Sequence, residues 1–359
     1  MNTKKAHIIA FYLPQFHPIK ENNEWWGEGF TEWTNVGKAR PLFHGHYQPH
    51  VPANLGYYDL RIPEVREKQA NLAREAGIDA FCYWHYWFGG GKQLMEMPLQ
   101  EVLKLGKPDF PFCLGWANHT WMKKSWNSEV SRFSQEKLIE QTYPGQKDWE
   151  DHFYAMLPAF KDDRYYKIKG KLAFLIYDPV SMPNVNKFLD YWQQLAKEQG
   201  LPGFYFIAQS QAYDIENVIL QCFDAINYEC KCDFFNNSRL RRLIAYTFKR
   251  PIIKHYKKIL KLYNLEKIKK NNIYPTVYPN WDNTPRLGYI GNVFKQSSPK
   301  LFKLHVKQIL DAISHKPEDD RIIFLKSWNE WAEGNYMEPD LEFGCGYLDA
   351  LRELLEEYD

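Results

Sequence analysis

Two glutamates near the end of the chain have the type and spacing that acid–base chemistry needs. Glu330 and Glu333 stand three residues apart in the stretch SWNEWAEG, beside Trp328 and Trp331. Burial of a carboxyl group against indole rings raises its pKa, and a second carboxylate nearby drives the two pKa values apart. Such a pair supplies one proton donor and one base at neutral pH, which is what cleavage of a glycosidic bond requires.

The same stretch can also be interpreted as the start of a helix. Asn329 would be a suitable N-cap, and Glu333 would lie in the first turn, where a carboxylate interacts favourably with the helix dipole. Against this interpretation, Gly334 ends the stretch too soon for a helix, and the tryptophans would remove water from both carboxylates. We therefore predict that Glu330 and Glu333 are the catalytic residues.

Eight short runs rich in β-branched and aromatic residues predict the strands that position this pair. They cover residues 7–13, 78–84, 110–116, 172–178, 204–209, 224–229, 273–279 and 321–328. Helical patterns lie between them, as in residues 62–77 and 185–200, which both end at a glycine where a left-handed C-cap is easiest. Eight such repeats predict an α/β fold, a closed (β/α)8 TIM-like barrel formed by residues 1–359 as a single catalytic unit.

An open doubly wound sheet is the alternative arrangement of the same elements. It is less well supported, because no Gly-rich phosphate loop follows an early strand. The stretch FGGGK, residues 88–92, lacks the Lys-Ser/Thr pair of a nucleotide-binding loop and predicts a flexible connection instead. In a barrel, the C-terminal ends of the strands face the active site, so residues that directly follow a strand are the candidates for binding.

Aromatic, amide and histidine side chains accumulate at these strand ends. Aromatic residues make up 17% of the chain, and a sugar stacks its apolar face on such rings while its hydroxyls bond to polar groups. The predicted sugar contacts are Tyr12, Trp33, His50, Trp84, His85, Trp116, Asn118, Tyr228 and Trp281. For each of these nine residues, the alternative to sugar contact is a role as a buried packing residue at the barrel rim. Asp282 and Arg286 are expected to hold the seventh loop by an ion pair, with an acidic sugar as the alternative partner.

Positive charge is concentrated in one segment. Residues 239–270 hold twelve Lys or Arg and one Glu, although the net charge of the whole chain is only +2. We expect a basic helical insertion over residues 233–272, after the sixth strand. Its interleaved apolar residues are typical of a helix that lies on an anionic membrane, and a helix pair packed on the barrel is the alternative. Without a second basic face, nucleic acid is not an expected partner.

The spacing of the cysteines indicates whether a metal site is expected, and the N-terminal residues indicate the expected location of the protein. The six cysteines lie far apart, except for Cys230 and Cys232, whose spacing is too tight for an ordinary zinc knuckle. No metal or other cofactor is therefore expected. The N-terminal apolar run is too short for a signal peptide, and no later run reaches the length of a membrane span. We expect a cytoplasmic protein, peripheral at the inner membrane if the basic segment binds lipid.

Four motifs together resemble those of a known family. They are FYLPQFHPIKENNEWWGEGFTEWTNV (residues 11–36), YWHYWF (83–88), GWANHTW (115–121) and SWNEWAEG (327–334). Over nearly the whole chain, the sequence resembles the WbsX-type proteins of bacterial surface-polysaccharide loci. That group is in turn similar to family 99 glycoside hydrolases, the endo-α-mannosidases, in barrel layout and in a Glu-Trp-x-Glu signature.

The resemblance implies an endo-acting, retaining glycoside hydrolase that cleaves an α-mannoside-like linkage in a bacterial oligosaccharide or polysaccharide. Glu330 would deprotonate the 2-hydroxyl of the sugar, which attacks C1 to give a 1,2-anhydro sugar. Glu333 would protonate the leaving oxygen and then activate water. Two alternatives remain open: a glycosyltransferase or transglycosylase in surface (O-antigen or capsular) polysaccharide biosynthesis, and a non-catalytic glycan-binding barrel.

Overall fold

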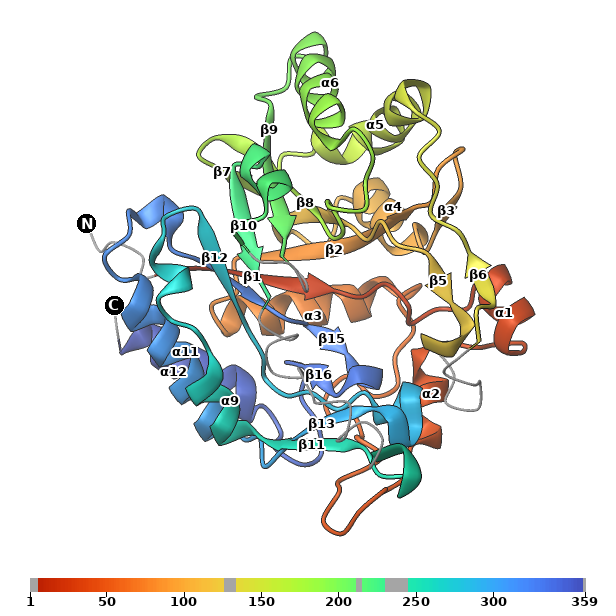
Figure 1. Ribbon diagram of the computed structural model, residues 1–359, viewed down its shortest axis with the longest axis vertical. Coiled ribbons are helices and arrows are strands. Elements are labelled where there is room, and N and C mark those ends of the chain that lie inside the picture. The colour runs from red at the N-terminus through yellow and green to blue at the C-terminus, as the bar shows by residue number, and fades with distance from the viewer. Residues whose placement is uncertain (1–5, 126–133, 211–214, 230–244, 358–359) are drawn as a thin grey trace.

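The strands form a closed parallel barrel (Figure 1). The computed structural model describes residues 6–125, 134–210, 215–229 and 245–357. The barrel strands are β1 (His7–Tyr12), β2 (Ala80–Trp87), β4 (Phe112–Trp116), β8 (Lys171–Ile176), β9 (Phe204–Gln209), β10 (Ala225–Tyr228), β12 (Ile273–Val277) and β14 (Ile322–Leu325). Each strand pairs in parallel with its neighbours, and β1 closes the sheet because it pairs with both β2 and β14. The predicted barrel is confirmed, and the open sheet is excluded.

The barrel strands are apolar over nearly their whole length because both faces of the sheet are covered. All eight residues of β2 are buried, and in β1 only His7 is partly exposed. Inside the barrel, the ring of Phe11 packs between Trp84 and Phe324, with centroid distances of 4.6 Å and 5.2 Å. This aromatic layer lies below the residues at the C-terminal strand ends and forms a rigid base for them.

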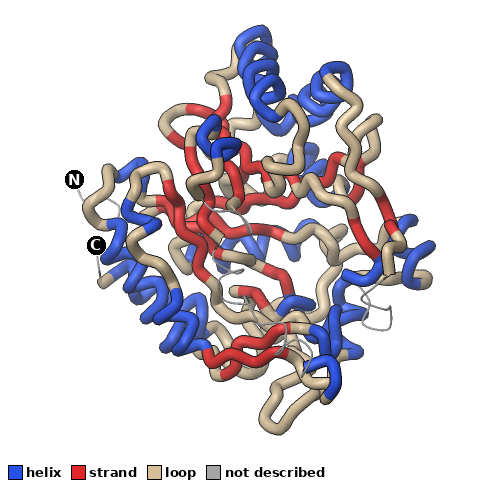
Figure 2. The backbone as a smooth tube through the Cα atoms, in the orientation of Figure 1, coloured by secondary structure: helices blue, strands red, loops and turns tan. Residues whose placement is uncertain are grey.

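Helices surround the strands, as Figure 2 shows. The outer helices are α3 (Pro63–Glu75), α4 (Met97–Leu105), α5 (Gln146–Phe160), α6 (Val185–Glu198), α11 (Pro299–Ile313) and α12 (Gly346–Glu356). In α6, Phe188, Trp192 and Leu195 recur at helical spacing and are buried against the sheet. The predicted helices over 62–77 and 185–200 are confirmed as α3 and α6. None of the described helices is both long and apolar enough to cross a bilayer.

Except for β7, which directly precedes β8, the shorter elements lie in the segments that follow the barrel strands. Two short helices, α1 (Lys20–Trp26) and α2 (Glu32–Lys38), follow β1, and α10 (Thr284–Leu287) follows β12. The small strands are β3 (Gln93–Leu94), β5 (Trp121–Met122), β6 (Lys137–Ile139), β7 (Lys167–Ile168), β11 (Ile252–His255), β13 (Asn292–Lys295), β15 (Asn329–Glu330) and β16 (Asn335–Tyr336). Of these elements, α2, α10, β5, β15 and β16 carry or support side chains of the site described below.

The basic segment packs on the barrel where it is described. Residues 230–244 lie outside the described residues. The remainder contains β11, which pairs with β13, the helix α9 (Tyr256–Leu262) and a 3-10 turn at Lys267–Lys269. Tyr256, Ile259 and Leu260 of α9 are buried, whereas its lysines are exposed. In this part the helical elements are α9 and the 3-10 turn, and the apolar residues of α9 are buried, which agrees with the alternative of helices packed on the barrel. The bounds 233–272 of the insertion stay a prediction.

Candidate active site

A cavity of about 290 Å³ at the C-terminal end of the barrel strands contains both predicted catalytic glutamates. Its aromatic wall consists of Trp84, Tyr86, His119, Trp121 and Tyr177, and its charged groups are Arg286, Lys326, Glu330 and Glu333. These side chains come from the ends of β2, β4, β8 and β14 and from the loop after β12. Rings on one side and charges on the other suit a ligand that is apolar on its faces and polar at its edges, as a sugar is.

The local fold around the glutamates differs from a helix start. Glu330 ends β15, which pairs antiparallel with β16, and a 3-10 turn over Trp331–Glu333 connects the two strands. Gly334 closes the turn at φ 57°, and a Cβ atom there would lie 2.8 Å from Cβ of Asp282. Asn329 attaches this hairpin to the end of β1, since its side-chain oxygen accepts from the backbone N–H of Leu13 at 2.8 Å. The hairpin is thus fixed to the barrel rim on both sides.

One guanidinium group contacts both carboxylates. Nη1 of Arg286 lies 3.3 Å from Oε1 of Glu330 and 3.0 Å from Oε1 of Glu333, so these two oxygens are at most 6.3 Å apart, the sum of both distances. The glutamate side chains are only 12% and 17% exposed. Inverting glycosidases separate their carboxyl groups by about 6.5–9.5 Å, and retaining ones by less. The two glutamates therefore converge closely enough for one saccharide unit to contact both.

Arg286 is itself held by a third glutamate. Its Nε donates to Oε2 of Glu32 at 3.0 Å, and Glu32, the first residue of α2, is completely buried. Burial raises the pKa of Glu32, although the Arg286 charge partly opposes this shift. Burial alone would lower the pKa of Arg286. The charges of Glu32, Glu333 and Glu330 outweigh this effect, so the pKa of Arg286 lies above its usual value. The guanidinium therefore stays charged and forms ion pairs with three carboxylates.

A second cation lies at the floor of the cavity. Nζ of Lys326 is 2.9 Å from Oε1 of Glu229 and 5.7 Å from the ring centroid of Phe11. Gln209 donates a short hydrogen bond to the other oxygen of Glu229. Burial would lower the pKa of Lys326, but Glu229 and Glu330 outweigh it and raise this pKa. Two buried cations, Arg286 and Lys326, thus line the same cavity as the two carboxylates.

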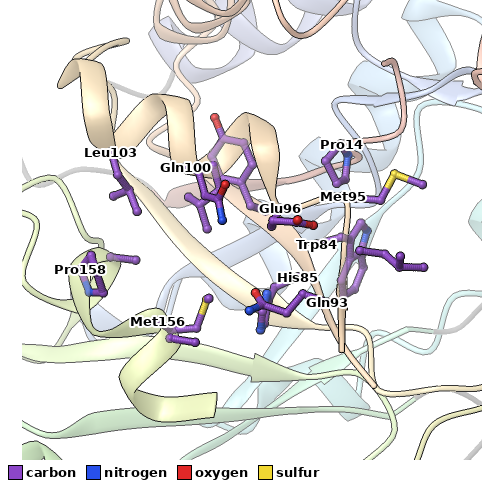
Figure 3. A pocket seen from close by; sticks show the side chains of 15 residues that line it. Pro14, Trp84, His85, Gln93, Met95, Glu96, Gln100, Leu103, Met156 and Pro158 are labelled. Atoms are coloured by element: carbon purple, nitrogen blue, oxygen red, sulfur yellow. The ribbon is translucent and has the colours of Figure 1, made fainter. Parts of the chain in front are cut away.

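Among the predicted sugar contacts, the structure places Trp84 in the cavity wall and His85 outside it. Side chains alternate along β2, so Trp84 and Tyr86 face inward while His85 faces α5. His85 Nε2 lies 2.7 Å from Nε2 of His152, and burial lowers the pKa of His85 to about 3. His85 lines a second, mainly apolar cavity of about 260 Å³ between β2, α4 and α5 (Figure 3).

Four further predicted contacts are buried in packing layers and do not line the active-site cavity. The Tyr12 hydroxyl donates to Gln69 of α3 at 2.7 Å, and Trp116 Nε1 donates to the Trp87 carbonyl at 2.9 Å. Tyr228 packs edge-on against Tyr263, and Trp281 is fully buried next to Tyr278. The structure therefore matches the alternative stated for these residues, a buried residue of the rim. Tyr12, Trp116 and Tyr228 point away from the barrel axis on their strands, and Trp281 is buried in the loop after β12.

The remaining three support the site from behind. Asn118 fixes the loop after β4 to the loop after β8, since it donates to the Asp178 carbonyl and accepts from the Asp178 N–H, at 2.8 Å and 2.7 Å. Trp33 packs on Trp331, with ring centroids 5.4 Å apart, and its Nε1 donates to the Tyr58 carbonyl at 2.7 Å. His50 contacts the Tyr336 hydroxyl. Of the nine predicted sugar contacts, Trp84 lines the active-site cavity, and the sugar-contact roles themselves stay predictions.

The expected ion pair between Asp282 and Arg286 is wrong. Asp282 Oδ2 lies 2.6 Å from His46 Nε2 and accepts from Gln48 Nε2 at 2.7 Å. Arg286 faces the glutamates instead, as described above. The backbone N–H of Asp282 donates to the Glu333 carbonyl at 2.7 Å, so the seventh loop positions the turn that carries Glu333.

A buried carboxyl group behind the site makes stability depend on pH. Glu338 accepts hydrogen bonds from Trp331 Nε1 and Gln69 Nε2, both at 2.6 Å, and from the Tyr58 hydroxyl at 2.9 Å. Burial raises the pKa of Glu338 to about 7 in spite of these donors. The folded state thus binds this proton more tightly than the unfolded state does.

We expect the stability contributed by the Glu338 proton to be fully present below about pH 4.5 and to be lost as the pH rises to 7. The free energy of unfolding of the wild type, relative to Glu338→Gln, should fall by up to about 3 kcal/mol across this window. Urea unfolding at pH 4.5, 6 and 7.5 measures it. A difference that does not vary with pH would show that Glu338 does not titrate in the folded protein.

Comparisons with known proteins place the chain in a family. The family model described as "Glycosyltransferase WbsX" matches residues 8–351. The chain belongs to this family. The resemblance found in the four motifs is therefore confirmed, and it extends over nearly all of the sequence.

Relatives and solved structures agree with this assignment. The WbsX-family chain is 33% identical over 362 residues to the protein WxcX of Xanthomonas campestris pv. campestris, a match that covers 98% of the chain. It spans about half the length of the curated relatives it matches, 50% of WxcX. A "Glycoside hydrolase-like protein" superimposes with a TM-score of 0.63, at 15% identity and with 99% and 94% of the two chains covered.

The family 99 endo-alpha-mannosidase from Bacteroides thetaiotaomicron superimposes with a TM-score of 0.57, at 17% identity and with 98% and 97% of the chains covered. At such identities these likenesses show the fold, a barrel shared with glycoside hydrolases. The family name describes a glycosyltransferase.

Proposed function

We propose that this WbsX-family protein is a retaining, endo-acting glycoside hydrolase that cleaves an α-mannoside-like linkage in a bacterial glycan. The observation that carries the proposal is the convergence of Glu330 and Glu333 on one nitrogen of Arg286 inside an aromatic-walled cavity. A spacing below that of inverting enzymes leaves no room for a water molecule between sugar and base, and so favours retention.

The roles of the two glutamates follow the family order along the chain. Glu330 accepts the proton of the 2-hydroxyl as this oxygen bonds to C1, and the bond from C1 to the leaving oxygen breaks while Glu333 gives that oxygen a proton. Water then attacks C1 and loses a proton to Glu333, and Glu330 returns its proton to the 2-oxygen as the anhydro ring opens. A hydroxyl is a weak nucleophile, so holding it in line next to a base supplies much of the rate.

Product analysis tests the proposal directly. The protein is incubated with α-mannosyl oligosaccharides that carry a fluorophore at the reducing end. Mass spectrometry should show release of oligosaccharide fragments, and proton NMR should show the α-anomer first. An initial β-anomer, release of monosaccharides alone, or no cleavage of any linkage in the panel would contradict it.

The family name supports a second candidate, transfer of a sugar during polysaccharide assembly. The same anhydro intermediate can be opened by an acceptor hydroxyl instead of water. A nucleotide-sugar donor is less well supported, because the acidic stretch Glu318–Asp320 lies directly before β14, at the end of the barrel opposite the cavity. Incubation with a nucleotide sugar decides this point, since release of nucleotide only in the presence of acceptor would establish transfer.

We also propose that the basic segment brings the protein to an anionic membrane surface, where a lipid-linked glycan would be its substrate. The exposed lysines 257, 258 and 261 support this contact, and the burial of the apolar residues of α9 makes it purely electrostatic. Sedimentation with anionic vesicles should therefore be strong at low salt and be lost at high salt. Equal recovery with neutral vesicles would contradict it.

A further inference from the structure

Outside the active-site cavity, one cluster combines a histidine with two carboxylates. His50, Asp340 and Glu342 each offer one ligand atom, and these atoms lie within 4.8 Å of one another. His50 belongs to the long loop after β1, and the two acidic residues belong to the loop between β16 and α12. We propose that this cluster is a structural site for one divalent cation of the zinc or manganese type, which joins the two loops.

Hydrogen bonds around His50 prepare it as a metal ligand. The hydroxyl of Tyr336 lies 2.8 Å from His50 Nδ1 and 2.6 Å from Asp340 Oδ2. An ionised carboxylate only accepts, so the hydroxyl donates its single proton to Asp340 and its oxygen accepts from the N–H at Nδ1 of His50. This tautomer leaves the lone pair on Nε2. A histidine that donates one ring N–H to a fixed acceptor is the usual arrangement at metal sites.

The cluster carries negative charge that the described part of the chain does not neutralise. No lysine or arginine among the described residues forms an ion pair with Asp340 or Glu342. His50 is only 4% exposed. A divalent cation bound here would compensate the charge of the two carboxylates.

The donor set selects the kind of cation. One imidazole with two carboxylates suits zinc or manganese, whereas calcium takes six to eight oxygen ligands and magnesium keeps several waters. Ligand atoms of a tetrahedral zinc site lie about 3.4 Å apart, so atoms that now lie within 4.8 Å of one another must approach by up to about 1.4 Å. Glu342 has an exposed side chain and can provide this movement. Water would complete the coordination.

A cation here would also brace the catalytic turn. His46 and Gln48, in the same segment as His50, fix the carboxylate of Asp282, whose backbone N–H bonds to the Glu333 carbonyl. The proposed cation would have a structural role and not a catalytic one, because none of its three ligands lines the active-site cavity. It is also independent of which reaction the protein catalyses.

Metal binding by the untagged chain tests the proposal without any substrate. After dialysis against EDTA, isothermal titration calorimetry with ZnCl₂ and with MnCl₂ at pH 7.5 should show one site per chain, and zinc should raise the melting temperature. The manganese titration separates this site from the free thiols Cys222 and Cys345, which favour zinc.

Three variants locate the site. Glu342→Gln should weaken binding by about tenfold or more, and Tyr336→Phe, which keeps the ring stacked on Trp331, should weaken it by about 10- to 100-fold. Glu356→Gln removes the same charge at an exposed position of α12, and this variant should bind the metal as tightly as the wild type does. Absence of saturable binding of both metals, or equal binding by Glu342→Gln and the wild type, would overturn the proposal.

Discussion

Glu333→Gln is expected to lower kcat for a glycan substrate by about 10²- to 10⁴-fold while the glycan still binds. Glutamine keeps the size and the polar contacts of the side chain, but it can neither donate nor accept the proton that the leaving oxygen requires. Turnover is followed by release of labelled product, and binding by calorimetry with the same oligosaccharide. Glu198→Gln, on the exposed face of α6, should retain full activity.

The leaving group separates the roles of the two glutamates. With an activated leaving group such as dinitrophenolate, which departs without a proton, the formation of the anhydro sugar should recover in Glu333→Gln. It should not recover in Glu330→Gln, because the 2-hydroxyl still lacks its base. Equal recovery in both variants would contradict the assignment, and unchanged turnover in either variant would remove that residue from the mechanism.

The barrel could be predicted because its signals are local. Each strand is a short apolar run that is buried on both faces, and α6 repeats its apolar residues at helical spacing before Gly200. Eight such units in one chain leave few arrangements other than a closed parallel sheet. The glutamate pair could be found for the same reason, since Glu330 and Glu333 lie together in the sequence, directly after the last strand.

The sugar contacts were harder to predict, because the sequence shows which residues follow a strand but not which way they point. Within the motif YWHYWF, Trp84 lines both the active-site cavity and the apolar cavity, whereas the next residue, His85, lines only the apolar one of these two. The alternation of a strand was the available signal, and it would have favoured Tyr86 together with Trp84. His119 and Tyr177 lie in irregular loops and Trp121 lies in the two-residue strand β5, which is too short to show such a periodicity.

The charged network could not be predicted from spacing. Glu32 and Arg286 are separated by 254 positions, so only the folded barrel brings them together. From the sequence, the simplest partner of Arg286 is the nearby Asp282. In the structure, however, the carboxylate of Asp282 contacts His46 and Gln48. Carboxylates buried at a barrel mouth require a cation, but which cation reaches them depends on the path of the long loops.

Replacement of Arg286 should therefore affect stability and catalysis together. In Arg286→Gln, the buried carboxylate of Glu32 loses its partner, and removal of one member of a buried ion pair typically costs about 3–5 kcal/mol. Glu330 and Glu333 also lose the positive charge between them, so the pH optimum for turnover should move upward. Urea unfolding measures the first effect, and kcat/KM between pH 4 and 9 measures the second.

Two further variants separate positioning from folding. Arg286→Lys keeps the charge but cannot direct one nitrogen to Glu32 and another to the catalytic pair, so it should recover part of the stability and little of the activity. Glu32→Gln combined with Arg286→Gln removes the stranded buried charge and should be more stable than Arg286→Gln alone. If this double variant also regained wild-type turnover at the original pH optimum, Arg286 would serve the fold alone. If Arg286 also serves catalysis, as a cation shared by Glu330 and Glu333, the double variant should be stable but slow. Its pH optimum for turnover should still be displaced.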